Sequence, residues 1–353
     1  MLFFYNSINV EAEAKQELKR HRRNLRYNTD PLALTDTAYV NKLITVLLTL
    51  SSDCRYLRWQ LHYRFVNNFR ISKSIFMDLL DGIDSSVDTR RAHGISKKEK
   101  LTACIIFFAS GRYQHGVGKD FHVAMAPTTF SKVLRRTLRP LHSLVGDWIN
   151  LRMTQSERQE AKEYFFLKSG IENVVMCVDG THVKIKKPQE RPLTFLNRKS
   201  FYSINTLIVC DHKTRIRAVD ARFAGSHHYA HIWRVSIVRK YFQRLHRSGQ
   251  RDKILGDAGY PSEPWLVRPH RDPDEGSAEA EFNKKHSSGR MIVEQTIGVW
   301  KSRFRCLAGT DRALNYDPKR SGLIINTCCA LHNICIENNI EWQQTFTDLL
   351  EDI

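Results

Sequence analysis

The sequence predicts an α/β fold, in which a mixed β-sheet flanked by helices follows an all-helical N-terminal domain. Near residue 171 the apolar residues change from helical spacing to β-branched runs, and these runs alternate with further helical segments. The chain has 353 residues, 42% of them hydrophobic, so it is long enough for two domains with real cores. A wholly disordered protein is therefore excluded.

The overall charge indicates a polyanionic partner. Lys and Arg outnumber Asp and Glu by 55 to 37, a net charge of +18, and cations that meet phosphates release condensed counterions. Nucleic acid is the leading candidate. The longest apolar run near the N-terminus, residues 43–50, is too short to span a bilayer, so no membrane segment is expected. The first residues also lack a secretory pattern, which predicts a protein that stays inside the cell.

The eight cysteines are expected to be reduced core residues. They lie in mostly apolar segments without a Cys-x-x-Cys pair, which favours buried thiols over disulfides. Cys328, His332 and Cys335 would share one face of a helix. One helix rarely closes a tetrahedral zinc site, so packing is the preferred interpretation of these three residues.

The N-terminal part is predicted to contain a basic arm, residues 1–35, and a helical domain, residues 36–150, with a helix-turn-helix at about 95–145. Ser96 and Glu99 have the spacing of a capping box before an apolar helix that reaches about Ser110. A second short helix is predicted through Phe121, and a third begins near Pro127. The three helices would form the DNA-binding module.

The third predicted helix carries a basic stripe. Four cations at i, i+3, i+4 and i+7 fall on one face, and these are Lys132, Arg135, Arg136 and Arg139. Such a face suits a helix that contacts DNA phosphates or enters a groove. The alternative is a solvated basic face on a helix that only packs against its neighbours.

The C-terminal part, residues 171–336, is predicted to form the α/β domain, between a polar linking helix at 151–168 and a C-terminal tail at 337–353. Within the run 174–185, which Asp179-Gly180 interrupts, a buried strand with Asp179 at its end is expected, then a hairpin of 202–210 and 216–223 around a turn at 211–214. A helix at about 229–245, a strand at 253–257 and a helix that carries Glu294 follow. This order of elements is the RNase H-like layout of a mixed sheet with helices packed against it.

Three acids are the best candidates for chemistry. Asp179 is expected on a buried strand, Asp257 at the entry to a Gly/Pro turn and Glu294 on a helix, so the three carboxylates can converge. Phosphodiester cleavage can use two divalent metals roughly 3.5–4 Å apart, and carboxylates suit Mg²⁺. The sequence thus predicts these acids as the catalytic, metal-binding residues of a nuclease. Taken singly, each acid could instead be a turn residue or a solvated helix residue.

Five short motifs point to a family. They are Asp179-Gly180-Thr181-His182, Gly256-Asp257-Ala258-Gly259-Tyr260-Pro261, residues 282–290, residues 293–307 and Leu331-His332-Asn333. Together they resemble the PIF/Harbinger group of DDE transposases, and most of all its domesticated members, the Harbinger transposase-derived nucleases. The resemblance covers about 95–336 and includes the spacing of 37 residues between Asp257 and Glu294 (294 − 257 = 37).

The resemblance implies a transposase-derived DNA nuclease with an RNase H-like core that depends on a divalent metal, Mg²⁺ first and Mn²⁺ as the alternative. It implies that Asp179, Asp257 and Glu294 are the metal-binding acids. It also implies a nuclear location, with the cytoplasm as the alternative, and a separate Myb-like DNA-binding protein as a second partner besides DNA.

One residue departs from the family pattern. The family commonly has Gly-Ser-x-His-Asp after the third strand, whereas here Gly225-Ser226-His227-His228 is followed by Tyr229. A phenol is a poor Mg²⁺ ligand. Two interpretations follow: an active nuclease that relies on the three acids, or a catalytically inactive protein that binds DNA or acts as an adaptor in the nucleus.

Two further basic segments flank the acids. Lys184, Lys186 and Lys187 follow Asp179, and Lys301 and Arg303 follow Glu294. Both segments are expected to follow a phosphate backbone beside the metal site. A solvated basic surface is the alternative for both.

Overall fold

The computed structural model describes residues 65–83, 94–111, 125–309 and 313–340. The predicted basic arm, the first part of the predicted helical domain and the second helix of the predicted helix-turn-helix lie outside these residues. None of the helices in the described part combines the length and the apolar character that a membrane span requires.

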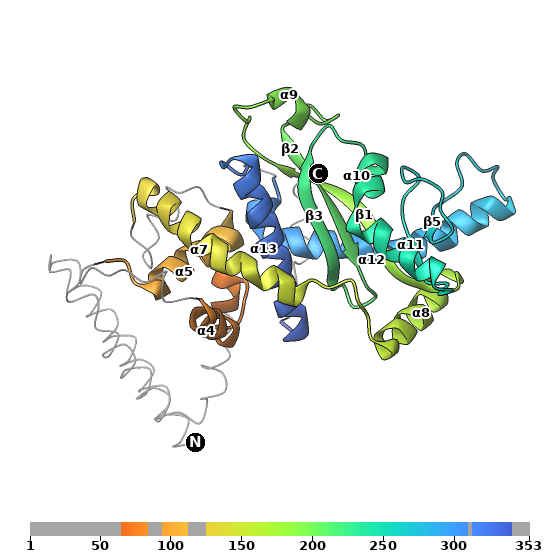
Figure 1. Cartoon of the computed structure of the whole chain (residues 1–353), viewed down its shortest axis with the longest axis horizontal. Helices are drawn as coiled ribbons and strands as arrows, with labels where there is room; N and C mark the ends of the chain where they lie inside the picture. Colours follow the sequence, from red (N-terminus) through yellow and green to blue (C-terminus); the bar gives the residue numbers. More distant parts are fainter. Residues whose placement is uncertain (1–64, 84–93, 112–124, 310–312, 341–353) are drawn as a thin grey trace, which may run out of the picture. The chain divides into compact units, whose positions relative to one another are not determined.

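In the described part of the chain, five strands form one mixed sheet, as predicted (Figure 1). The strands lie in the order β3-β2-β1-β4-β5. They are β1 (Val174–Lys184), β2 (Ser203–Cys210), β3 (Ile216–Ala224), β4 (Lys253–Leu255) and β5 (Leu266–Val267). The pairs β1–β2 and β2–β3 are antiparallel, and β1–β4 and β4–β5 are parallel. The predicted hairpin is therefore confirmed.

Two strands differ from the prediction. The first strand does not end at its acid: β1 continues through Asp179 and Gly180, which pair with Ile208 and Leu207 of β2. The long antiparallel neighbour keeps the backbone extended beyond the Asp-Gly pair, which alone favours a turn. Strand β5 was not predicted, because two residues carry no periodic pattern.

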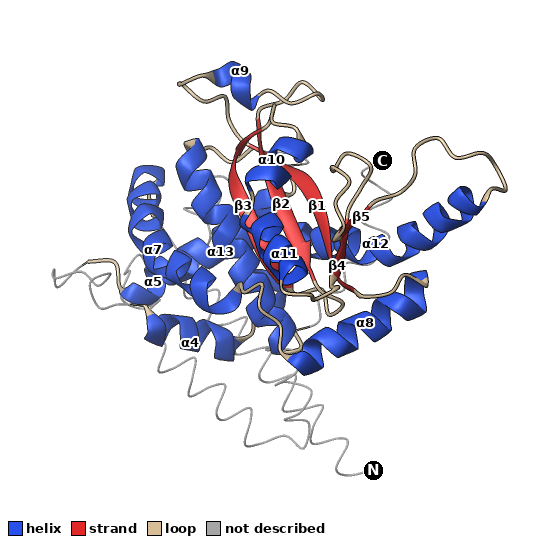
Figure 2. Ribbon diagram, turned by 45° about the vertical axis from the view of Figure 1, so that its right-hand side comes forward, coloured by secondary structure: helices blue, strands red, loops and turns tan. Residues whose placement is uncertain are grey.

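Helices cover both faces of the sheet. Figure 2 shows α10 (Tyr229–Val235) and α11 (Ile237–Arg247) in front of the strands, with α12 (Ala278–Arg303) and α13 (Pro318–Glu337) behind them. One helix was predicted where α10 and α11 lie. Ser236 separates them, because its backbone is extended (ψ 150°) and its hydroxyl accepts a hydrogen bond from Arg239 N (3.0 Å), which caps α11.

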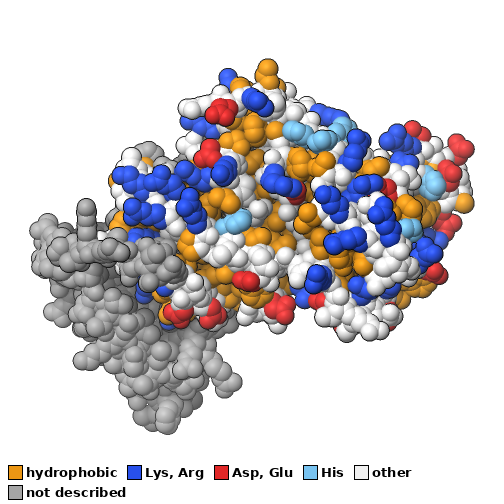
Figure 3. Space-filling view, viewed as in Figure 1, with side chains coloured by type: hydrophobic (Ala, Val, Ile, Leu, Met, Phe, Trp, Pro, Cys, Tyr) orange, Lys and Arg blue, Asp and Glu red, His pale blue; other side chains and the backbone are white. Residues whose placement is uncertain are grey.

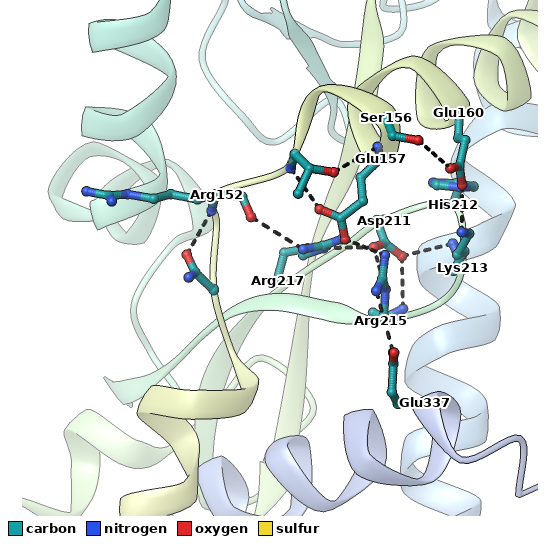
Figure 4. Close-up of polar contacts among 12 residues, drawn as sticks. Arg152, Ser156, Glu157, Glu160, Asp211, His212, Lys213, Arg215, Arg217 and Glu337 are labelled. Atoms are coloured by element: carbon teal, nitrogen blue, oxygen red, sulfur yellow. Dashed lines mark hydrogen bonds and ion pairs between the residues drawn. The ribbon is translucent and has the colours of Figure 1, made fainter.

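A buried ion network fixes the β2–β3 hairpin to α8 (Gln155–Ser169), the predicted polar helix (Figure 4). Asp211 Oδ2 accepts hydrogen bonds from Nε of Arg215 (3.1 Å) and Nε of Arg217 (2.7 Å). Glu157 Oε1 accepts from Nη2 of the same arginines (2.8 and 2.6 Å). Nη1 of Arg217 reaches the carbonyl oxygen of Arg152 at 3.5 Å. Every nitrogen of the Arg217 guanidinium therefore has a partner.

The remaining described helices precede the sheet. They are α4 (Lys73–Gly82), α5 (Lys97–Ser110) and α7 (Pro127–Trp148). The predicted capping box is confirmed, since Ser96 accepts from Glu99 N and the Glu99 carboxylate accepts from Ser96 N. The helix α7 continues through Pro140. With residues 112–124 outside the described part, the helix-turn-helix stays a prediction.

The helices α4, α5 and α7 share a hydrophobic core with α13 and one face of the sheet. Phe107 of α5 lies 5.6 Å from Phe130 of α7, between ring centroids, and both side chains are buried. Cys328, His332 and Cys335 of α13 are buried too, and His332 Nε2 lies 3.0 Å from the carbonyl oxygen of Thr214. These three residues therefore pack in the core. The domain boundary expected near residue 150 stays a prediction.

Candidate active site

The sheet brings two of the predicted acids to one edge. Leu255 of β4 pairs with Cys177 of the parallel strand β1, and Asp257 and Asp179 each lie two residues further along. Because side chains alternate along a strand, the two acids continue in step at the carboxyl end of the β1–β4 pair. The charge of Asp257 contributes to the raised pKa of Asp179, which reflects their proximity.

Asp179 is a largely buried carboxylate, with 15% of its side chain exposed. Its Oδ1 accepts a hydrogen bond from Gly180 N (2.8 Å), and its Oδ2 accepts one from Nη2 of Arg290 (2.8 Å). Burial raises the pKa of Asp179, although the charge and hydrogen bond of Arg290 act in the opposite direction. The ionised carboxylate is thus held at a cost in free energy.

The third acid reaches the site from α12. Glu294 lies one turn after Arg290, and its Oε1 forms an ion pair with the same Nη2 atom at 2.9 Å. Its side chain is 57% exposed, so Glu294 lies on the open side of the site. Asp257 is fixed differently, since its Oδ1 accepts from Gly259 N at 2.8 Å. The structure therefore brings Asp179 and Glu294 together through one guanidinium.

Tyr229, the departure from the family pattern, lies inside this site. It is the first residue of α10, and its ring lies against Gly180 and stacks on Tyr260 with 6.0 Å between centroids. Burial raises the pKa of the Tyr229 hydroxyl, and the charges of Asp179 and Asp257 raise it further. The hydroxyl therefore keeps its proton at neutral pH and offers no anionic oxygen to a metal.

The carboxylate donors fit a divalent cation in kind, because Mg²⁺ and Mn²⁺ prefer oxygen ligands. A positive charge already lies between Asp179 and Glu294, that of Arg290. Among the described residues, no three His, Cys, Asp or Glu side chains are gathered closely enough to hold an ion as they stand. The site thus has the right ligands, with a guanidinium between two of them.

The predicted DNA-contacting residues fall into two groups. The exposed ones are Lys132, Arg135, Arg136 and Arg139 on α7, and Lys186 and Lys187 after β1. Figure 3 shows lysine and arginine side chains gathered over α7, on the left of the described surface. Lys184 is half-buried, with Nζ 5.7 Å from the ring centroid of Phe201.

The structure does not place Lys301 and Arg303 on an open surface. Lys301 Nζ donates to Thr181 Oγ1 (2.7 Å) and to the His182 carbonyl (2.9 Å), and burial lowers the pKa of Lys301 to about 8. Arg303 is 1% exposed and donates to the backbone carbonyl of Ile340 at 2.8 Å. Both cations therefore tie α12 to its neighbours, and the expectation that they line a phosphate path is corrected.

Sequence reasoning missed two features of the site and its surroundings. One is Arg290, whose signal is its position four residues before Glu294 on a helix. The other is the exposed basic stripe of Lys240, Arg244 and Arg247 on α11, visible over α11 in Figure 3. Its signal is a stretch of residues, 221–251, with seven Lys and Arg and no Asp or Glu.

Comparisons with known proteins agree with this site. A family model described as DDE superfamily endonuclease matches residues 178–333, which contain all three acids. The chain is 31% identical over 272 residues to "Putative nuclease HARBI1" of Bos taurus, which covers 76% of each chain. It is 30% identical to the Homo sapiens protein of the same name over the same shares. It is 25% identical to "Protein ALP1-like" of Arabidopsis thaliana over 77% of this chain and 70% of that protein.

No solved structure matches the chain. The family model and the sequence relatives both match the domain in which the acids lie on β1, just after β4 and on α12. The chain therefore belongs to the PIF/Harbinger family of DDE transposases, together with the Harbinger transposase-derived nucleases.

Proposed function

We propose that the protein is a divalent-metal-dependent DNA nuclease with an RNase H-like core, in which Asp179, Asp257 and Glu294 hold the metal ions. One observation carries the proposal: the parallel pair β1–β4 sets Asp179 and Asp257 in step at one edge, where α12 adds Glu294. The family supports DNA as the substrate, since a nuclease that descends from a transposase acts on DNA.

The bound ions would activate the attacking oxygen and stabilise the leaving oxygen of the phosphodiester, with Mg²⁺ as the proposed metal and Mn²⁺ as the alternative. The protein fixes where this happens. Gly180 N and Gly259 N orient the carboxylates of Asp179 and Asp257, so the two acids need little reorganisation. Glu294 completes the set from the open side, where a phosphate can approach.

Three basic surfaces would hold the DNA. They are the α7 stripe (Lys132, Arg135, Arg136 and Arg139), the pair Lys186 and Lys187, and the α11 stripe (Lys240, Arg244 and Arg247). The α11 stripe has the spacing i, i+4, i+7, which spans roughly 10 Å of helix, the scale of neighbouring phosphates on one strand. The helix that carries this stripe follows α10, whose first residue is Tyr229.

A second candidate function is a DNA-binding or adaptor protein without catalysis. The observation that favours it is the half-buried ring of Tyr229 against Gly180 and near Gly259, beside two of the acids, where the family commonly has a further carboxylate. In either case we propose that the protein acts in the nucleus, with a Myb-like protein as a second partner, on the strength of the family and of the charge. Imaging of the tagged protein in cells tests the location.

Nicking of supercoiled plasmid DNA by the purified protein in Mg²⁺ and in Mn²⁺ tests the proposal. Asp257→Asn is expected to abolish nicking and to leave DNA affinity largely intact. Glu172→Gln, an exposed acid before β1, serves as the control and is expected to nick like the wild type. DNA binding without nicking by the wild type in either metal would favour the second candidate.

A further inference from the structure

One arginine nitrogen serves two of the proposed metal ligands. Nη2 of Arg290 donates a hydrogen bond to Oδ2 of Asp179 at 2.8 Å and forms an ion pair with Oε1 of Glu294 at 2.9 Å. Arg290 and Asp179 are largely buried, with 18% and 15% of their side chains exposed. A guanidinium is always protonated in proteins, so Arg290 lies between the two acids as a cation.

The contact pattern of Arg290 differs from that of a structural arginine in the same protein. Arg217 uses Nε, Nη1 and Nη2 for separate oxygen partners. In Arg290 one nitrogen makes both carboxylate contacts, and its Nε is buried without a hydrogen-bond partner among the described residues. The guanidinium of Arg290 is therefore less completely hydrogen-bonded than that of Arg217, and an unpaired buried donor costs free energy.

A divalent cation and Arg290 would compete for the same carboxylate. Oδ1 of Asp179 accepts a hydrogen bond from Gly180 N and Oδ2 accepts one from Arg290, so a cation bound to this carboxylate would lie beside the guanidinium or displace it. Two positive charges at one carboxylate repel strongly in a partly buried site. Glu294 has two carboxylate oxygens, so Oε1 can stay in contact with Arg290 while the second oxygen binds the metal.

We propose that Arg290 is a positioning residue that substitutes for the divalent cation in the metal-free protein, and that it gives up Asp179 and retains Glu294 when the metal binds. The inference rests on the proposed function. Arg290 neutralises acids that would otherwise repel each other, and it holds Glu294 on α12 beside β1. Metal binding therefore exchanges one cation for another, and the acids keep their places.

The test compares Arg290→Gln and Arg290→Lys with the wild type, by Tm in EDTA and by calorimetric titration with MnCl₂ and MgCl₂. Arg290→Gln is expected to lower Tm in EDTA and to bind Mn²⁺ about tenfold more tightly, within the usual range of coupling between competing ligands. Arg290→Lys keeps a competing charge and is expected to restore affinity close to that of the wild type.

Arg239→Gln is the matched control, because Arg239 donates to Glu263 at 2.6 Å, which stands outside the acid set. It is expected to lower Tm equally with and without metal. If the wild type binds metal and Arg290→Gln binds it equally or more weakly, the proposed role of Arg290 is wrong, whereas the metal site itself is not contradicted. Metal binding by neither protein would overturn both the metal site and that role.

Discussion

The ring of Tyr229 lies on the backbone of Gly180, where any side chain would overlap its carbons Cδ1, Cε1 and Cζ. The ring also faces the glycine beside the second acid, since a Cβ at Gly259 would lie 3.7 Å from Tyr229 Cδ2. Both glycines donate their N–H groups to the neighbouring acids, Asp179 and Asp257. The ring of Tyr229 thus lies between strand β1 and the turn that follows Asp257, and its packing depends on the absence of side chains at Gly180 and Gly259.

Gly180→Ala is expected to cost about 2 kcal/mol of unfolding free energy, a typical penalty for overpacking a filled site. In a Tyr229→Ala background the added methyl group has space, and the cost should fall well below 1 kcal/mol. The difference between the two costs would then exceed the deviation of about 0.5 kcal/mol seen between independent sites. Denaturant unfolding of the four proteins of this double-mutant cycle measures the coupling. Additive effects would show that the ring does not occupy the place described.

Tyr229→Asp is expected to tighten Mn²⁺ and Mg²⁺ binding and to lower Tm in EDTA. The new carboxylate adds a hard oxygen ligand beside Asp179 and Asp257, and without metal the like charges repel. Tyr229→Asn is the matched control, since it removes the ring without adding charge. Calorimetric titration and thermal unfolding measure both effects, and equal metal affinity of the Asp and Asn variants would dismiss residue 229 as a determinant of metal binding.

The α11 stripe is expected to set part of the salt dependence of DNA binding. Replacing Lys240, Arg244 and Arg247 with Ala should reduce the slope of log affinity against log salt by roughly 2 to 3, since each phosphate contact contributes about 0.9. Fluorescence anisotropy over a salt series measures the slope. A triple Ala variant of three exposed lysines on other helices, Lys73, Lys98 and Lys319, should leave it nearly unchanged. Equal slopes for both variants would remove α11 from the DNA surface.

The ion network in Figure 4 predicts an acid-sensitive contribution to stability. Partial burial acts to raise the pKa of Glu157, but hydrogen bonds from Arg217 and Thr154 N and the charges of Arg217 and Arg215 lower it to about 2. Because this pKa lies below the unfolded value of about 4.3, the stabilisation is present above that pH and is lost as the pH falls toward 2.

Glu157→Gln should therefore cost about 2 kcal/mol at pH 7, a typical value for a charge-assisted hydrogen bond. The difference from the wild type should shrink steadily below about pH 4. Urea unfolding across this range measures it. Glu163→Gln on the same helix, at an exposed position, is the control. A difference that stays constant with pH would show that the charge of Glu157 is not what stabilises the hairpin.

Local signals predicted much of this architecture. The capping box at Ser96, the 211–214 hairpin turn and the helix of Glu294 follow from short-range spacing, and the structure confirms each. The predictions that the structure contradicts concern residues whose contacts are with partners distant in the chain. Asp-Gly reads as a turn until β2 pairs alongside it, and Arg303 reads as a surface cation until the carbonyl oxygens of Arg70 and Ile340 enclose it.

The positions of the three acids were accessible from motif order, whereas the role of their neighbours was not. Arg290 stands in the sequence as one cation among many, and only the packing of α12 against β1 shows that it bridges Asp179 and Glu294. Tyr229 was visible as a departure from a pattern. The contact of its ring with Gly180 depends on the position of α10 over the sheet, which no local pattern indicates.

The helix α7 lies against α13, and Asn333 of α13 ties the C-terminal end of α7 to the sheet. Its Nδ2 donates to the carbonyl oxygens of Trp148 (2.7 Å) and Ile216 (2.8 Å), and its Oδ1 accepts from Ile216 N (2.8 Å). Loss of α7 would remove one partner of this side chain and expose the surface of α13 that α7 covers. The stability of the domain that carries the three acids therefore depends on α7, whatever that helix binds.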